Sequence, residues 1–198
     1  MNLRKFIKIY DGALSDEFCD EVVSLFGAQA FNQTGPAGQP MGTDFLGNDE
    51  SHWTEMEIDD LDGWLQVKDE LIHNCQYYTT KYASETGVDI PNRMMLEAFR
   101  IKHYKTADSD NFMQHVDADC FEKSVRYLVY IWYLSDVQKG GETKFTNTNL
   151  SVRSKKGRLL MFPPYWLFPH AGKAPVSHDK YIIGTFLNFP APDEFSAG

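Results

Sequence analysis

The sequence predicts a mainly β protein in which two N-terminal helices support one antiparallel sheet of a sandwich or barrel. Helical periodicity is confined to residues 1–90, whereas after Pro91 short segments rich in aromatic and β-branched residues follow one another with turn residues between them. A length of 198 residues fits one hydrophobic core. We therefore expect a single domain over 1–198, with helical support in 1–90 and the β core in 91–190.

A strand and two helices are expected in the N-terminal part. Residues 5–10 alternate as a strand does, and Ser15 precedes two acidic residues, the pattern of a helix N-cap. Apolar residues at three-to-four residue spacing predict a long amphipathic helix from Asp60 to Glu85, ended near Gly87. Between the two helices, Asn32–Ser51 is rich in Gly, Pro and Asn and too long for a tight connection, so we interpret it as a candidate lid.

The remainder of the chain is predicted to consist of short strands. Each segment is rich in aromatic and branched residues and is bounded by turn residues, and no internal repeat is visible. The expected strands are Met94–Tyr104, Phe112–Asp117, Tyr127–Leu134, Glu142–Phe145, Arg158–Phe162 and Lys180–Phe189.

Charge and composition exclude several classes of protein. A net charge of -9 disfavours sequence-independent binding to nucleic acid, because phosphates would be repelled. The sequence contains no apolar run long enough for a signal peptide or a membrane span, so we expect a cytoplasmic protein without a membrane partner. Cys19, Cys75 and Cys120 form no CxxC pair, which disfavours a disulfide framework or a zinc ribbon and suggests buried thiols.

A candidate metal site follows from His115 and Asp117, which flank Val116 in a predicted strand. Residues two apart in a strand point to the same face, so an imidazole and a carboxylate can converge. His170, which follows a Pro-rich turn, is the best third ligand, aimed back by a rigid loop. Two histidines and one carboxylate suit non-haem iron(II) and leave coordination positions open, although an HxD pair alone is weak evidence.

Lys180 strengthens the case for a site. It lies ten positions beyond His170 at the start of an otherwise apolar strand. A lysine drawn into a barrel needs an anion, and a dicarboxylic cosubstrate would supply one. The alternative is that Lys180 marks the solvated end of its strand.

Several motifs occur in a fixed order between Phe99 and Phe189. The most specific runs from Tyr133-Leu134-Ser135-Asp136-Val137 to Gly140-Gly141-Glu142-Thr143, and the others are Arg100–Tyr104, His115-Val116-Asp117, Lys156-Gly157 and His170 through Pro175-Val176 to Lys180. On these motifs the chain resembles the prolyl 4-hydroxylase branch of the Fe(II)/2-oxoglutarate-dependent dioxygenases. The opening strand and helix, Phe6 to Phe26, also look like that family's entry element. The resemblance implies a double-stranded β-helix, which is a cupin-like jelly roll.

The resemblance also implies the chemistry. Such enzymes bind Fe(II), 2-oxoglutarate and O2, are kept active by ascorbate, and hydroxylate an unactivated carbon with release of succinate and CO2. An intact carboxylate at position 117 favours hydroxylation, because halogenating relatives carry a small residue there. The residues implied are His115, Asp117 and His170 as iron ligands, Lys180 with neighbours Tyr104 and Thr143 for 2-oxoglutarate, and Arg126 and Phe186 on the substrate side.

The substrate implied is a prolyl residue in a peptide or protein, although a small molecule such as free proline fits as well. An oxidative nucleic-acid demethylase shares the HxD and distal histidine, but the acidity of the chain and a single lysine in place of arginines disfavour it. A non-enzymatic or zinc-binding jelly-roll module is a third reading. Lys180 and Thr143 favour the dioxygenase over such a module, because a binding or zinc module does not need a buried basic residue beyond its last metal ligand.

Overall fold

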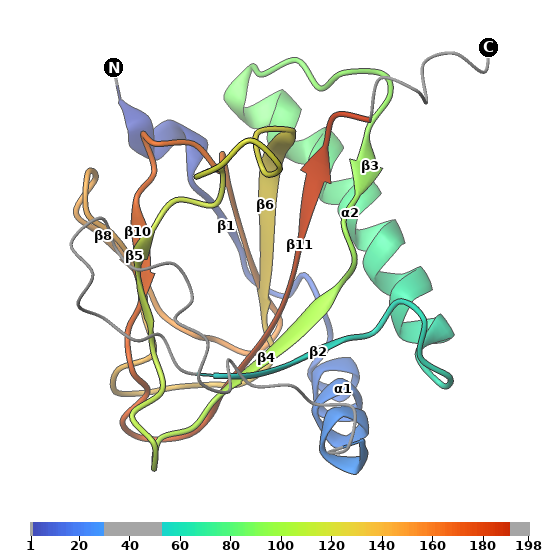
Figure 1. Cartoon of the computed structure of the whole chain (residues 1–198), viewed down its shortest axis with the longest axis vertical. Helices are drawn as coiled ribbons and strands as arrows, with labels where there is room; N and C mark the ends of the chain where they lie inside the picture. Colours follow the sequence, from blue (N-terminus) through green and yellow to red (C-terminus); the bar gives the residue numbers. More distant parts are fainter. Residues whose placement is uncertain (1, 30–52, 191–198) are drawn as a thin grey trace.

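Two antiparallel sheets face each other in the computed structural model, which describes residues 2–29 and 53–190 (Figure 1). The larger sheet has the order β1-β9-β6-β11-β4-β2, with β3 paired to β11, and the smaller has the order β5-β10-β7-β8. The predicted jelly roll with supporting helices is therefore confirmed. The candidate lid Asn32–Ser51 lies outside the described residues. None of the helices in the described part is both long and apolar enough to cross a bilayer.

The helices form where capping and periodicity predicted them. A 3-10 turn, η1 (Leu3–Phe6), precedes α1 (Asp16–Ala28), whose first turn is capped by the Ser15 Oγ accepting from the Phe18 N–H at 3.1 Å. The second helix, α2 (Leu65–Thr86), ends at Gly87 in the left-handed conformation. It begins later than expected, because the residues before Leu65 form tight turns with bonds to carbonyls three residues back.

The larger sheet includes two strands from residues 1–90, so this part of the chain contributes strands as well as helices. The predicted strand Met94–Tyr104 is divided into two shorter ones, and the strand expected over residues 5–10 begins only at Lys8. The strands are β1 (Lys8–Tyr10), β2 (Thr54–Glu57), β3 (Met95–Leu96), β4 (Arg100–Tyr104), β6 (Arg126–Tyr133), β9 (Arg158–Phe162) and β11 (Lys180–Asn188).

The smaller sheet consists entirely of strands of three or four residues. Two of them, β8 and β10, were not predicted, because so short a segment shows no alternation of its own. The four are β5 (Phe112–His115), β7 (Thr143–Phe145), β8 (Leu150–Val152) and β10 (His170–Gly172).

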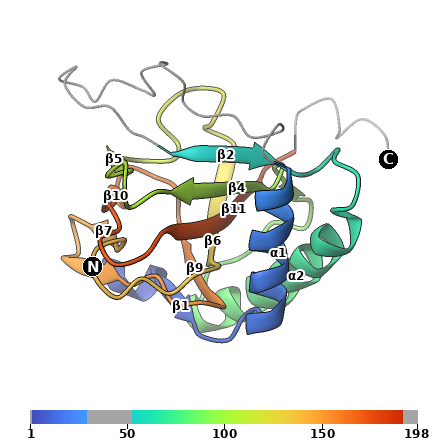
Figure 2. The same cartoon turned by 90° about the horizontal axis from the view of Figure 1, so that it is seen from below.

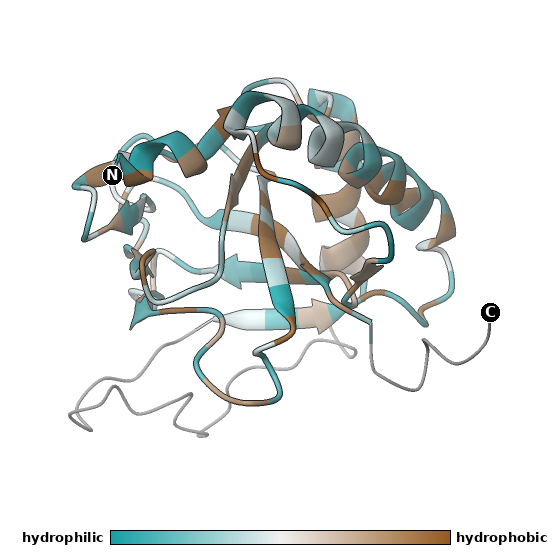
Figure 3. Cartoon of the chain, turned by 90° about the horizontal axis from the view of Figure 1, so that it is seen from above, coloured by the Kyte–Doolittle hydropathy of each residue, from teal (hydrophilic) through white to brown (hydrophobic). Residues whose placement is uncertain are grey.

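Both helices cover the face of the larger sheet that points away from the smaller sheet (Figure 2). The molecule has two hydrophobic cores, and alternate side chains of β6 contribute to each. Leu128, Tyr130 and Trp132 pack toward the helices. Val129 and Tyr133 pack between the two sheets. Figure 3 shows apolar residues along these strands and on the helices. The space between the sheets is thus a second core, and polar side chains pointing into it need a specific reason to be there.

The expectation of buried thiols is right for Cys19 and Cys75 and wrong for Cys120, which is exposed. Cys120 lies after Asp117 in the irregular segment between β5 and β6, whose side chains at positions 119–122 are exposed.

Gly140 fixes the approach of two loops that lead to the ends of β7 and β11. Its φ is +71°, and a Cβ there would stand 2.2 Å from the Ala174 carbonyl oxygen. We expect Gly140→Ala to lower the free energy of unfolding by about 3 kcal/mol, through left-handed strain and this clash. Urea unfolding would measure it. Gly63→Ala is the matched control, because φ is +86° there and no atom lies within 4 Å. If both variants lost the same free energy of unfolding, the clash at position 140 would have no role.

Candidate metal centre

Two histidines and one aspartate converge between the sheets. His115 ends β5, His170 begins β10, and the two are paired residues of adjacent strands. His115 Nε2 lies 3.6 Å from Asp117 Oδ1, and His170 Nε2 lies 3.6 Å from Asp117 Oδ2. The ligand atoms of the three residues all lie within 4.8 Å of one another. The three side chains can therefore bind one metal ion together, all from the same side of the ion.

The structure corrects the local reasons for this convergence. Asp117 was expected in the strand of His115, but β5 ends at His115, and Asp117 is held instead by its N–H, which donates to the Pro164 carbonyl at 3.1 Å. His170 was expected in a loop, but it is the first residue of β10. Sheet pairing and one backbone hydrogen bond, rather than alternation within a strand, bring the three together.

Backbone carbonyls select the tautomer of both imidazoles. The Nδ1 of His115 lies 2.7 Å from the Met113 carbonyl oxygen, and that of His170 lies 3.1 Å from the Phe168 carbonyl oxygen. Since a carbonyl only accepts, each Nδ1 carries the proton, and in the neutral ring Nε2 keeps a free lone pair. Both histidines are thus oriented to offer Nε2 to a metal.

Burial and charge favour the protonation states that a metal requires. Burial lowers the pKa of His170 to about 4, and the neighbouring His115 acts in the same direction, so the ring is neutral at physiological pH. Burial alone would raise the pKa of Asp117, but the two imidazoles and Arg126 outweigh it and lower this pKa to about 2. Within the described residues, His115 Nε2 and Asp117 Oδ2 are buried without a hydrogen-bond partner, as expected of atoms reserved for a metal.

Lys180 lies deeper between the sheets, paired across strands with Tyr104. Lys180 is 2% exposed, so it is not the solvated end of a strand. Its Nζ lies 5.1 Å from the Tyr104 ring and 5.5 Å from the Tyr133 ring, and no described residue forms an ion pair with it. Burial lowers the pKa of Lys180 to about 8, against the opposing effect of Glu142. A buried cation without a counter-ion is stabilised by an anion that enters the site.

Tyr104 lies beside this lysine, and Tyr133 is a neighbour that sequence reasoning missed and that connects the lysine to Thr143. The Tyr133 hydroxyl donates to Thr143 Oγ1 at 2.7 Å in the buried interior. Burial raises the pKa of Tyr104, so its phenol stays neutral. These hydroxyls can satisfy the oxygens of a carboxylate held by the ammonium group.

Arg126 and Phe186 lie together near Asp117. The guanidinium carbon of Arg126 is 3.7 Å from the Phe186 ring centroid. Its Nε and Nη2 donate to Glu97 at 2.7 and 2.8 Å, and its Nη1 donates to the Asp117 carbonyl at 2.8 Å. The arginine therefore fixes the backbone of the aspartate from the side of the sheet where β6 begins.

A column of rings that the sequence did not reveal supports His115. Phe112 stacks on His115 with ring centroids 3.7 Å apart, and Trp53 packs on Phe112 at 4.6 Å. The Lys102 Nζ lies over the first two rings of this column, 4.5 Å from the Trp53 ring centroid and 4.9 Å from the Phe112 ring centroid. Lys102 could have been identified as a candidate because it precedes Tyr104 by two residues and so shares its face.

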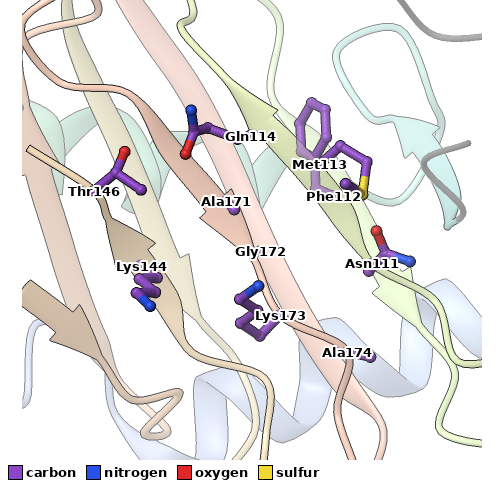
Figure 4. A pocket seen from close by; sticks show the side chains of 10 residues that line it. All are labelled: Asn111, Phe112, Met113, Gln114, Lys144, Thr146, Ala171, Gly172, Lys173 and Ala174. Atoms are coloured by element: carbon purple, nitrogen blue, oxygen red, sulfur yellow. The ribbon is translucent and has the colours of Figure 1, made fainter. Parts of the chain in front are cut away.

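A separate hollow of about 360 Å³ lies on β5, β10 and β7, on the face that carries the exposed Lys144 (Figure 4). Its lining includes Gln114 and Lys173 but none of the three metal-binding candidates. The hollow and the candidate metal centre are therefore distinct features of the smaller sheet.

Comparison with known proteins agrees with this geometry. Residues 99–188 match the model of the 2OG-Fe(II) oxygenase superfamily. No curated protein sequence matches the chain.

Solved structures similar to the chain include several prolyl hydroxylases. The viral collagen prolyl hydroxylase from Paramecium Bursaria Chlorella virus-1, in its 2OG complex, has a TM-score of 0.69 at 18% identity and covers 93% of this chain and 97% of its own. A second similar structure is a Trichoplax adhaerens prolyl hydroxylase in complex with a peptide of the hypoxia inducible factor oxygen degradation domain. Its TM-score is 0.72 at 14% identity, and the match covers 98% of this chain and 88% of its own. A Pseudomonas putida prolyl-4-hydroxylase has a TM-score of 0.68 at 12% identity, and the match covers 94% of each chain. At such identities the likeness establishes the fold.

Proposed function

We propose that this chain is a 2-oxoglutarate-dependent dioxygenase that hydroxylates a prolyl residue of a peptide or protein, as the match of residues 99–188 to the 2OG-Fe(II) oxygenase superfamily supports. The observation that carries the proposal is the cluster of His115, Asp117 and His170 with the buried ammonium group of Lys180, which forms no ion pair with any residue that the structure describes. The prolyl assignment is supported by the similar solved structures, which are prolyl hydroxylases.

In this proposal the two histidines and Asp117 hold iron(II), and Lys180 holds the distal carboxylate of 2-oxoglutarate with Tyr104 and Thr143 beside it. The bound metal and cosubstrate would supply the oxidation. One oxygen atom of O2 would be incorporated into succinate, the other would form the new hydroxyl group on the substrate carbon, and CO2 would be released. The chain itself orients both imidazoles through Nδ1, keeps Asp117 ionised, and excludes water with the core around Tyr133. Arg126 and Phe186 are proposed to face the substrate.

Succinate formation tests the proposal directly. Purified protein with Fe(II), ascorbate, 2-oxoglutarate and oxygen is expected to release succinate slowly, and faster when a proline-rich peptide is added. Mass spectrometry should then find an added oxygen on a prolyl residue. If the protein does not bind 2-oxoglutarate and purifies with tightly held zinc, the zinc-module reading replaces this one.

The affinity for 2-oxoglutarate is expected to fall at alkaline pH. Lys180 binds the cosubstrate only when charged, and its pKa is lowered to about 8, so the charged fraction decreases as the pH rises above that value. The dissociation constant should increase about tenfold between pH 7 and pH 9, as titration of 2-oxoglutarate into Mn(II)-loaded protein would show. Lys180→Arg is the control, because its guanidinium stays charged and its response should be flat. The same slope in both proteins would contradict the assignment.

A further inference from the structure

Lys102 is a second inward-pointing lysine for which the proposed reaction has no role. It lies in the middle of β4, on the face that carries Tyr104, and its side chain is only 21% exposed. Its partner across the sheet is Ile182, two residues beyond Lys180. Lys102 therefore lies one step along the strands from the Tyr104–Lys180 pair, toward the end where Arg126 and Phe186 lie.

The ammonium group of Lys102 is close to the metal-binding residues. Its two aromatic neighbours are Trp53 and Phe112, and Phe112 stacks directly on His115. Burial lowers the pKa of Lys102, and the charge of Asp117 is near enough to act in the opposite direction. An anion bound at Lys102 would thus lie beside the iron rather than on the outer surface.

Hydrogen bonding distinguishes Lys102 from the two arginines on the same side of the barrel. Arg100 donates hydrogen bonds from Nε and Nη2 to Glu57. Arg126 donates from two nitrogens to Glu97 and from the third to the Asp117 carbonyl oxygen. Within residues 2–29 and 53–190, by contrast, the ammonium group of Lys102 donates no hydrogen bond, and its nearest acidic oxygen is 3.7 Å away.

The one ion pair of Lys102 in that part of the chain leaves its donors available. Glu55 Oε2 lies 3.7 Å from the Nζ, and this oxygen also accepts from Trp53 Nε1 at 2.7 Å. Burial lowers the pKa of Lys102, and Glu55 opposes this effect. An ammonium group has three N–H donors, so the contact with Glu55 leaves donors of Lys102 to spare.

We infer that Lys102 binds a carboxylate of the substrate, which makes it a residue that determines specificity; this inference rests on the proposed function. Lys180 and the metal account for both ends of 2-oxoglutarate, so the second ammonium remains for another anion. A carboxylate fits better than a phosphate, because Lys102 is a single point donor and the acidic Glu55 and Asp117 beside it would repel a dianion. The carboxylate could belong to a free amino acid or to an acidic residue next to the hydroxylated proline.

Two pairs of probes that differ in one charge test the inference and distinguish these sources. L-proline is compared with L-prolinamide, and the blocked peptide Gly-Pro-Glu with Gly-Pro-Gln, by the stimulation of succinate release above the unstimulated rate. In at least one pair the carboxylate member should have a kcat/KM at least about tenfold higher, as expected for a charge-assisted hydrogen bond.

Three variants separate recognition from folding. Lys102→Met should reduce the preference to about twofold or less, while the unstimulated rate and the 2-oxoglutarate dissociation constant stay unchanged. Lys102→Arg should keep the preference. Lys144→Met removes the same charge from the exposed face of β7 and should change nothing.

The outcomes are separable. The inference is overturned if neither carboxylate probe is preferred by the natural protein, if the preference survives Lys102→Met, or if that variant weakens 2-oxoglutarate binding instead. Loss of the proposed function would look different, because the natural protein would then not turn over 2-oxoglutarate at all.

Discussion

Replacing His115 with Ala is expected to abolish succinate formation and to weaken metal binding by more than about 100-fold. The substitution removes one of three converging ligands, and no other described histidine, cysteine or acidic residue belongs to the cluster. Titration of Mn(II) followed calorimetrically would measure the affinity, and succinate release would measure turnover.

Two further variants make this result interpretable. Asp117→Asn keeps the shape of a ligand but removes its charge, so it should also lose metal affinity without a change in fold. His73→Ala alters an exposed histidine on α2, whose Nδ1 lies 2.7 Å from the Asp69 carbonyl oxygen, and should leave both readouts unchanged. Iron-dependent turnover in the His115→Ala protein would show that the metal centre lies elsewhere.

Replacing Lys180 with Met is expected to increase the dissociation constant of 2-oxoglutarate about 100-fold while leaving metal affinity unchanged. Lys180 is 2% exposed and, in the described part of the chain, has no ion-pair partner, so the cosubstrate would lose the buried cation at this position. Calorimetric titration of 2-oxoglutarate into the metal-loaded protein would measure this loss.

The same variant should make the ligand-free protein more stable, by about 1–3 kcal/mol near pH 7. The folded-state pKa of Lys180 is about 8, below the usual 10.5, so burying the charged form costs stability below pH 10.5, and this cost is complete below pH 8. Methionine removes it. Urea unfolding with and without 2-oxoglutarate would reveal opposite effects. Lys144→Met, which alters an exposed lysine, should produce neither. Equal destabilisation in both conditions would mean that Lys180 is structural.

Local sequence determined the elements that are long enough to show a period. Ser15, the apolar spacing of α2 and the alternating aromatics of β6 each predicted their own element, because capping and burial of one face depend on neighbours in the chain. The motifs around His115 and His170 likewise identified the candidate ligands before any geometry was known.

Tertiary structure alone decided how those ligands meet and what surrounds them. His115 and His170 converge because β5 pairs with β10, and Asp117 is positioned by a carbonyl of a distant loop. Lys102 gains significance only through Trp53 and Phe112, which come from other segments. The physical reason is that strands of two to four residues carry too little pattern to specify a partner, so their pairing is fixed by the core that the whole chain buries.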